Sequence, residues 1–297
     1  MGIALRSYKY PDDFDSVGRF LAQTYRTDGK HINWLRPRWE YMHYHPLIEQ
    51  VNLNSIGIWE ADGQIVGVVH PEHRPGTAYF QVEPSSPSLK RQMLGYAEEH
   101  LRSERDGRRV LRLFINDRDD EFQNVATEKG YTKHTDFEAV SRLLIPDSLP
   151  AVSLPSGFRL KSLAEENDIQ KINRLYWRGF DHGDEPPEDS AEGVELMQSA
   201  PNFRKDLNIV IQAPDGSLVS YCGMWNEPVQ RVAYVEPVAT DSDYRRRGLA
   251  STAVLEGIRR CGECGATVAY VGAVRPLYLS IGFQQLYSCS VWQREWS

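Results

Sequence analysis

A set of short motifs recurs along this 297-residue chain at a nearly constant spacing. The turn Asp62-Gly63 is matched by Asp215-Gly216, and Val82-Glu83-Pro84 is matched by Val235-Glu236-Pro237, each time 153 residues later. Two weaker matches keep the same order, between Leu5 and Phe158 and between Tyr131 and Phe283. Four matches in order at a nearly constant spacing indicate two copies of a single domain.

Each copy is predicted to fold as a mixed α/β sheet flanked by helices. In both copies a short strand precedes an amphipathic helix, and an Asp-Gly hairpin between alternating strands follows. A long helix is then expected at residues 86–104 of the first copy and at about 247–261 of the second, before a further strand. The expected division is a first domain at 1–145, a linker with Pro and Ser at 146–157 and a second domain at 158–297.

Charge and composition exclude several classes of function. The formal net charge of −7 argues against general binding to nucleic acid. The start of the chain does not resemble a signal peptide and no long apolar run occurs, so we expect a cytoplasmic protein with no membrane partner. Cys261 and Cys264 form one C-G-E-C pair without a second pair or a nearby His, so we expect no metal site.

Three consecutive arginines, Arg245 to Arg247, precede Gly248 at a predicted strand-to-helix junction. The first turn of a helix leaves backbone N–H groups unpaired and carries a partial positive charge, so it favours phosphate. Gly248 allows close approach of the backbone, and Ala250 and Ser251 keep that approach uncrowded. Arginines at this end oppose the helix dipole, which an anionic ligand would explain; a charged helix start that faces water is the alternative.

These motifs resemble those of the GNAT superfamily of acyl-CoA-dependent N-acyltransferases. The family motif R/Q-x-x-G-x-G/A is matched by Arg245, Gly248 and Ala250, and L-Y-x-x-x-G-F is matched from Leu277 to Phe283. The chain as a whole is similar to tandem GNAT proteins, in which two such domains are fused. The first copy lacks the Arg-x-x-Gly pattern, and Pro87 removes one N–H donor. We therefore expect a degenerate first domain that has lost cofactor binding and serves structure, partner contact or the acceptor site.

The resemblance implies that acetyl-CoA is the cosubstrate. Backbone N–H groups from Arg246 to Ser251 would cradle its pyrophosphate, and an N–H near Val238 would donate to the thioester carbonyl. The expected cofactor-binding residues are Val238, Ala239, Thr240, Arg245, Arg246, Arg247, Gly248, Leu249, Ala250 and Ser251. The family's common Asn falls on Val271 here, which puts one pantetheine hydrogen bond in doubt.

The resemblance also suggests catalytic residues. Tyr278 stands at the position of the family's general acid, with packing on the pantetheine or the core as the alternative. The family's usual glutamate position is Tyr234 here, and Glu236 lies two residues on, so Glu236, Tyr234 or water is the base. The presence of Val-Glu-Pro in both copies weakens a purely catalytic role for Glu236.

The acceptor is expected to be an amine of a small molecule or a peptide, of unknown identity. The acidic stretch 179–189 would suit a cationic amine, although a solvated loop is the alternative. Aromatic and histidine side chains between Trp34 and His45 would line a pocket or pack in the core. Two functions remain open, an active acetyltransferase and a non-catalytic acyl-CoA-binding sensor or scaffold, and a homodimer is equally open.

Overall fold

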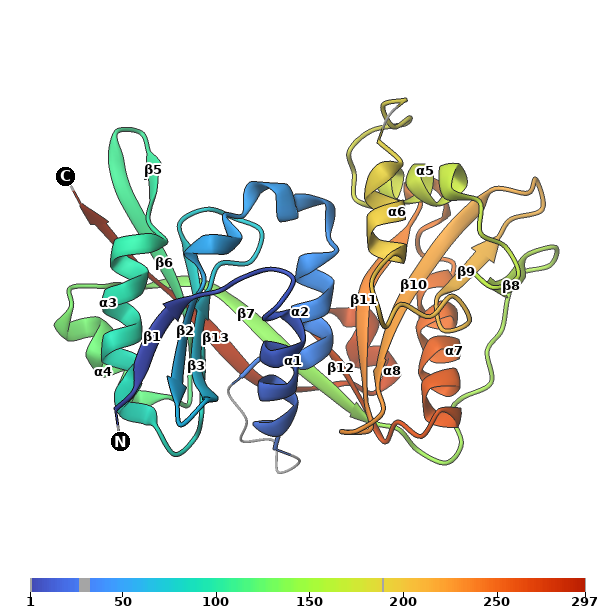
Figure 1. The fold of residues 1–297 in the computed structure, drawn as a ribbon. Coiled ribbons are helices and arrows are strands. Elements are labelled where there is room, and N and C mark those ends of the chain that lie inside the picture. The colour runs from blue at the N-terminus through green and yellow to red at the C-terminus, as the bar shows by residue number, and fades with distance from the viewer. Residues whose placement is uncertain (1, 27–32, 189, 297) are drawn as a thin grey trace. The chain divides into compact units, whose positions relative to one another are not determined.

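The computed structural model describes residues 2–26, 33–188 and 190–296, and these form two compact units (Figure 1). Unit 1 comprises Met1–His43, Leu47–Ala139 and Leu286–Ser297, and unit 2 comprises Tyr44–Pro46 and Val140–Gln285. Each unit contains a β-sheet with α-helices packed on its faces, as predicted. Every helix in the described part of the chain is too short or too polar to cross a lipid bilayer.

Unit 1 consists largely of the first sequence copy. Its strands are β1 (Ala4–Ser7), β2 (Gly57–Ala61), β3 (Gln64–His70), β4 (Thr77–Val82), β5 (Ser103–Arg105), β6 (Arg108–Asn116) and most of β13 (Gln284–Trp296). The helices of this part of the chain are α1 (Phe14–Gln23), α2 (Arg36–His43), α3 (Lys90–His100) and α4 (Asp120–Glu128), with short 3-10 helices η1 (Pro46–Gln50), η2 (Leu53–Ser55) and η3 (Pro87–Leu89). The strands lie in the order β1-β2-β3-β4-β6-β13, in which β4 and β6 are parallel and the other neighbours are antiparallel.

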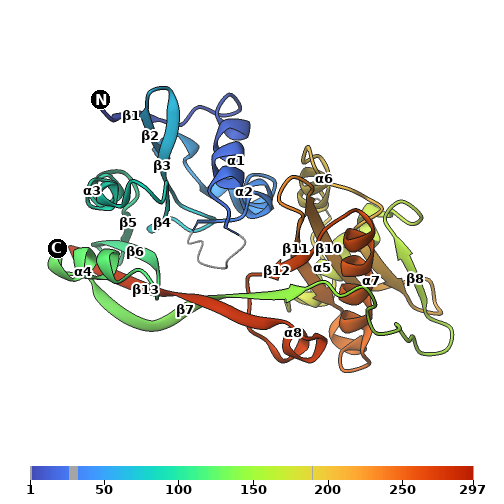
Figure 2. The ribbon, with the colours of Figure 1, turned by 90° about the horizontal axis from the view of Figure 1, so that it is seen from below.

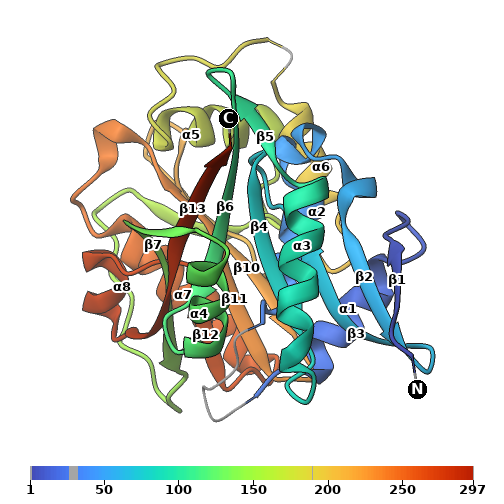
Figure 3. The same cartoon turned by 90° about the vertical axis from the view of Figure 1, so that its left-hand side faces the viewer.

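Helices cover both faces of the unit 1 sheet. The strands β2 and β3 lie between α3 on one face and α1 on the other (Figures 2 and 3). The periodic residues Phe14, Val17 and Leu21 of α1 are buried, as their spacing predicts. On the other face, Met93 of α3 and Phe122 of α4 share one hydrophobic core.

Unit 2 repeats this plan with the second sequence copy. Its strands β8 (Arg159–Ser162), β9 (Ile209–Gln212), β10 (Leu218–Glu227), β11 (Val232–Thr240) and β12 (Val268–Val271) lie in this order. Its helices are α5 (Ile169–Gly179), α6 (Glu192–Gln198), α7 (Leu249–Glu263) and α8 (Pro276–Ile281), and η4 (Ser242–Tyr244) is a 3-10 turn. Ile209 and Ile211 of β9 pack in a hydrophobic cluster with residues of α7, whereas Val210 packs in a separate cluster with residues of α5. Helices therefore cover both faces of the unit 2 sheet.

Each sheet is completed by a strand from a distant part of the sequence. In unit 1, residues 289–296 of β13 pair antiparallel with residues 109–116 of β6. In unit 2, the last residues of β7 (Thr132–Leu144) pair with β12, from Ser141 opposite Val271 to Leu144 opposite Val268. The linker predicted at residues 146–157 is placed from the sequence repeat, and its position between the two domains stays a prediction.

The predicted hairpins and long helices are found. Asp62 and Gly63 have φ values of 52° and 76° in the tight turn between β2 and β3, and Gly216 lies in the antiparallel connection of β9 to β10. The helices expected at 86–104 and about 247–261 correspond to α3 and α7. The first is shorter than expected at both ends, because Pro87–Leu89 form a 3-10 turn before it and Ser103–Arg105 form β5 after it.

Candidate functional site

The parallel strands β11 and β12 separate in the middle of the unit 2 sheet. They pair over three positions, residues 232–234 with residues 268–270. β12 then ends at Val271, whereas β11 continues to Thr240. The second half of β11 therefore has an edge that β12 does not cover.

A register shift in β11 accompanies this separation. Cys222 of β10 pairs with Val238, but Met224, two residues on, pairs with Val235. β11 thus holds one extra residue between these pairs, which is the pattern of a β-bulge. The extra residue lies in the stretch Glu236-Pro237, whose peptide bond is cis.

Gly223 of β10 makes room for the bulge. A Cβ built on Gly223 would lie 2.4 Å from the backbone oxygen of Glu236, so only glycine fits there without movement. Trp225 Nε1 donates a hydrogen bond to the same oxygen at 2.8 Å. Glu236, Val238 and Thr240 are partly exposed, whereas Pro237 and Ala239 between them are buried.

The backbone of Val238 faces the uncovered edge. The N–H of Asp241 donates to Val219 O on β10 at 3.0 Å, two residues beyond the pair of Ala239 with Tyr221. Since hydrogen-bonding positions alternate in an antiparallel ladder, Val238 presents its N–H and C=O away from β10. The predicted N–H donor near Val238 therefore lies on the side where β12 has ended.

The N-terminus of α7 follows the end of β11 through the turn η4. Arg246 and Gly248 both have positive φ, 61° and 77°, and the first intrahelical bond runs from Thr252 N to Gly248 O at 3.0 Å. The N–H groups of residues 249–251 precede that bond, as at any helix start. A Cβ built on Gly248 would meet nothing within 4 Å, so the space in front of this helix end is open. Arg246 and Arg247 are exposed beside it.

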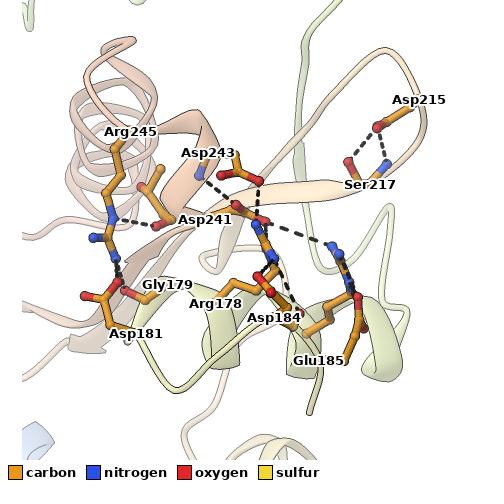
Figure 4. Close-up of polar contacts among 12 residues, drawn as sticks. Arg178, Gly179, Asp181, Asp184, Glu185, Asp215, Ser217, Asp241, Asp243 and Arg245 are labelled. Carbon is orange, nitrogen blue, oxygen red and sulfur yellow. Dashed lines mark hydrogen bonds and ion pairs between the residues drawn. The ribbon is translucent and has the colours of Figure 1, made fainter.

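The guanidinium of Arg245 forms hydrogen bonds with other residues of unit 2 at this junction (Figure 4). Its Nη2 donates to Gly179 O at 2.9 Å and to Asp181 Oδ1 at 2.8 Å, and its Nε donates to Thr240 O at 3.3 Å. Arg245 therefore joins the end of β11 to the end of α5. Its predicted role as a cofactor ligand stays a prediction.

The negative charge of Glu236 acts on the phenol of Tyr278. Tyr278 lies in α8, 7% exposed, and its ring packs edge-on against Phe283 with 5.7 Å between ring centroids. Burial raises the pKa of the Tyr278 phenol well above its ordinary value, and the negative charge of Glu236 raises it further. A phenol with a raised pKa stays protonated at neutral pH, which a proton donor requires. Tyr234, the third residue considered for catalysis, is 5% exposed.

The acidic stretch after α5 is largely paired with arginines of unit 2. Asp181 binds Arg245, Asp184 binds a second arginine of α5, and Glu185 binds Arg174 at 2.9 Å (Figure 4). Residue 189, at the end of this stretch, lies outside the described residues. These carboxylates are thus engaged by the chain itself, and the cation-binding role considered from the sequence stays a prediction.

Part of the aromatic cluster of the first copy packs inside unit 1, whereas Tyr44 and His45 belong to unit 2. Trp34, Trp39 and His43 are buried, and the rings of Trp39 and His43 lie 4.3 Å apart. Cys222 and Cys261 are buried and Cys264 is exposed. In the described part of the chain, no three His, Cys, Asp or Glu side chains gather into a group that could hold a metal ion.

The corresponding helix start in unit 1 is built differently. α3 begins with Lys90, whose Nζ forms an ion pair with Asp119 at 2.6 Å, and both side chains are at least nine-tenths buried. Lys90 Nζ also lies 5.9 Å from the ring centroid of Phe122. A buried ion pair therefore stands where unit 2 has exposed arginines and a glycine.

Two residues that shape the site escaped the sequence reasoning. Gly223 has no motif around it, and its close contact with Glu236 depends on the register of two strands. Arg178 does carry a signal, because it follows Ile172 and Leu175 at helical spacing and so lies on the buried face of α5. A charged side chain on a buried helix face is expected to pair with an opposite charge.

Comparison with known proteins identifies the family of unit 2. Residues 169–283 match the model of the acetyltransferase (GNAT) family. No curated protein matches the chain significantly in sequence.

The whole chain shares its fold with several solved structures. A GCN5-related N-acetyltransferase from Sphaerobacter thermophilus is 16% identical with a TM-score of 0.68, over 99% of this chain and 95% of that chain. A tandem GNAT protein from the clavulanic acid biosynthesis pathway is 13% identical with a TM-score of 0.64, over 99% and 98%. The N-myristoyltransferase of Saccharomyces cerevisiae, solved with bound myristoyl-CoA, is 10% identical with a TM-score of 0.57, over 100% and 80%.

These findings confirm the resemblance and the fold predicted from the sequence. The family match covers the bulge, the arginine-rich turn and Tyr278, and the structural matches cover both units. Unit 2 carries a domain of the acetyltransferase (GNAT) family, and the chain as a whole has the fold of tandem GNAT proteins.

Proposed function

We propose that unit 2 transfers the acetyl group of acetyl-CoA to an amine of a small molecule or a peptide, as an acyl-CoA-dependent N-acetyltransferase. One arrangement supports this proposal above all. The uncovered edge of β11 leads through the turn η4 to the open N-terminus of α7, and the charge of Glu236 on that strand acts on Tyr278. The proposed base therefore lies on β11, the proposed phosphate-binding helix end follows that strand, and the proposed proton donor lies in α8.

The residues of this junction fit acetyl-CoA. The first-turn N–H groups of Leu249, Ala250 and Ser251 would hold the pyrophosphate, because helix N-termini favour anions. Arg246 and Arg247 are exposed and would add charge-assisted contacts. The backbone of β11 from Val238 to Thr240 would hold the pantetheine arm along its uncovered edge.

The chemistry requires stabilisation of an oxygen and two proton transfers. Bound acetyl-CoA supplies an acetyl group activated as a thioester. The Val238 N–H is suited to donate a hydrogen bond to the carbonyl oxygen, and a fixed backbone donor needs no reorganisation. Tyr278 holds the proton that the departing sulfur needs. Glu236 accepts the proton of the amine, directly or through a water molecule.

A panel of amines tests this proposal. The protein is incubated with acetyl-CoA and one amine at a time, and release of free thiol is followed. We expect acceptor-dependent release with at least one amine class. Binding of acetyl-CoA in calorimetry without thiol release for any amine would instead support a binding module, and absence of binding would contradict the proposal entirely.

A further inference from the structure

Arg178 is held in an unusual place for an arginine. It lies on the face of α5 that packs Ile172 and Leu175 into the core, and its side chain is 8% exposed. Its Nε donates to Asp241 Oδ2 at 2.7 Å, and the side chain of Asp241 is 3% exposed. The burial of these two opposite charges is possible because they pair with each other. Removal of one charge would leave the other buried without a counter-charge, which is energetically costly.

The same guanidinium binds two further carboxylates (Figure 4). Its Nη2 donates to Asp243 Oδ2 at 2.5 Å, and its Nη1 donates to Asp184 Oδ1 at 2.8 Å. Asp243 belongs to η4, the turn that follows β11, and Asp184 belongs to the segment after α5. The planar fork of arginine, with five N–H donors, suits three acceptors, whereas lysine offers a single charged point.

Asp241 in turn shapes the turn η4. Its Oδ1 accepts a hydrogen bond from Asp243 N at 3.0 Å, and its backbone O accepts one from Tyr244 N at 2.9 Å. Its own N–H donates to Val219 O of β10 at 3.0 Å. Asp241 therefore fixes where the chain leaves the sheet, directly before the arginines and Gly248.

The end of α5 also fits closely against the end of β11. A Cβ built on Gly179 would lie 2.9 Å from Ala239 Cβ and 3.1 Å from Thr240 N. Arg245 bridges the same two ends through Gly179 O and Thr240 O. The C-terminus of α5 and the start of the phosphate-binding turn thus form one packed assembly around Arg178.

We propose that Arg178 is a positioning residue for the acyl-CoA site. It neutralises Asp241 and Asp243 and anchors the turn that leads to the N-terminus of α7, without needing to touch the ligand. Loss of Arg178 would leave a buried negative charge in the segment that approaches the pyrophosphate, and it would free that segment. Both effects weaken the binding of an anionic ligand. This inference rests on the proposed function of unit 2.

Titration calorimetry of the full chain with CoA tests the inference. Arg178→Met removes the charge and keeps most of the apolar stem, and we expect the affinity for CoA to fall at least tenfold. Combining Arg178→Met with Asp241→Asn removes the uncompensated carboxylate, and we expect part of the affinity to return. Arg204→Met is the control, since the exposed Arg204 pairs with the half-buried Asp206 in the same unit and its loss changes the net charge equally.

The outcomes are distinguishable. A folded Arg178→Met variant that binds CoA as tightly as the parent would overturn the inference. If Arg178→Met does not fold, the variant that combines it with Asp241→Asn decides between the outcomes. A CoA affinity equal to that of the parent would overturn the inference, and a weaker CoA affinity would support it. A weakened Arg204→Met variant would also overturn it, since net charge alone would then explain the effect. A parent chain that binds no CoA would overturn the proposed function and, with it, this inference.

Discussion

The side-chain amide of Asn33 pairs with both backbone groups of Val82. Asn33 Nδ2 donates to Val82 O and Val82 N donates to Asn33 Oδ1, each at 2.9 Å. Glu83 N donates to Val66 O on β3, so in the alternating ladder the neighbouring Val82 faces away from β3. On that side β4 pairs with β6 at residues 77–78. Asn33 therefore fills in unit 1 the strand edge that β12 leaves uncovered in unit 2.

We expect acetyl-CoA to bind once per chain, in unit 2. In unit 1 the edge of β4 is occupied by Asn33, which is 3% exposed, and α3 begins with the buried pair of Lys90 and Asp119. Displacing Asn33 would break two buried hydrogen bonds, at a cost of about 1–3 kcal/mol for each group left unsatisfied. Calorimetry should give a stoichiometry of one, and two equivalent sites would contradict the degenerate first domain.

Gly248→Asp should abolish binding of acetyl-CoA. The change places a carboxylate at the N-terminus of α7, where the pyrophosphate is proposed to lie. The fold should persist, because nothing lies within 4 Å of the added Cβ and Asp is among the residues that tolerate a positive φ. Gly248→Asn is the matched control, since it has the same shape without the charge. Equal affinities of the two variants for acetyl-CoA would argue against a pyrophosphate at this helix end.

Gly223→Ala should disturb the bulge at Glu236. The new Cβ would lie 2.4 Å from Glu236 O, a backbone atom held by Trp225, so β11 must shift. We expect a loss of about 1–3 kcal/mol in the free energy of unfolding, together with weaker binding of acetyl-CoA. Gly95→Ala is the control, because nothing lies within 4 Å of its Cβ and helix α3 should gain about 0.5–1 kcal/mol. Urea titrations of both variants measure the difference.

The parts of the site that lie close together in the sequence could be predicted. The start of α7 at Leu249 and the position of Gly248 follow from the change of hydrophobic period at a strand-to-helix junction. The repeat at a spacing of 153 residues likewise predicted two similarly built parts before any contact was known. Local patterns of this kind can be recognised in the sequence without knowledge of the folded structure.

The parts that depend on distant pairs could not be predicted. Arg178 meets Asp241 across 63 residues, and Asn33 meets Val82 across 49. Nothing in the spacing of either pair distinguishes it from any other polar pair, because such a contact exists only after the strands have taken their register. The bulge at Glu236 is of the same kind, since one extra residue matters only relative to β10.

The stability of the chain should fall as the pH drops below about 6.5. His43 and His70 are buried, and burial lowers their pKa values from 6.5 to about 4 and about 3. Gln81 Oε1 accepts from Trp34 N, so Gln81 Nε2 donates to His70 Nε2, which must stay unprotonated. Between pH 6.5 and 4 the unfolded state binds these protons and the folded state does not, so stability is lost by about 1.4 kcal/mol per pH unit for each histidine.

Urea titrations at pH 5, 6 and 7 check this slope. His43→Gln should reduce the slope of stability with pH by about the contribution of one proton, or about 1.4 kcal/mol per pH unit, whatever its effect on absolute stability. His100→Gln makes the same substitution at an exposed histidine of the same unit and serves as the matched control. Carboxylates with lowered pKa values, such as Glu72, add to acid sensitivity mainly below about pH 4.5. A flat profile from pH 7 to 5 would mean that the buried histidines are not neutral in the folded state.

Tyr278→Phe should separate catalysis from binding. The ring of Tyr278 packs against Phe283 in the core of unit 2, and phenylalanine preserves that packing. The affinity for acetyl-CoA should therefore stay as in the parent. Tyr221→Phe is the structural control, because its hydroxyl donates to Asn208 Oδ1 at 2.5 Å within the core and its loss should lower stability but not kcat.

If the Tyr278 hydroxyl protonates the departing sulfur, its removal should lower kcat by roughly a hundredfold or more, the range expected for general acid catalysis. The loss should appear in kcat rather than in KM for acetyl-CoA, because the lost interaction exists mainly in the transition state. Steady-state kinetics with an active amine measures both. A Tyr278→Phe variant with full kcat would remove Tyr278 from the mechanism and leave water as the proton donor. In a pure binding module no amine would support turnover, and the Phe variant would match the parent in every assay.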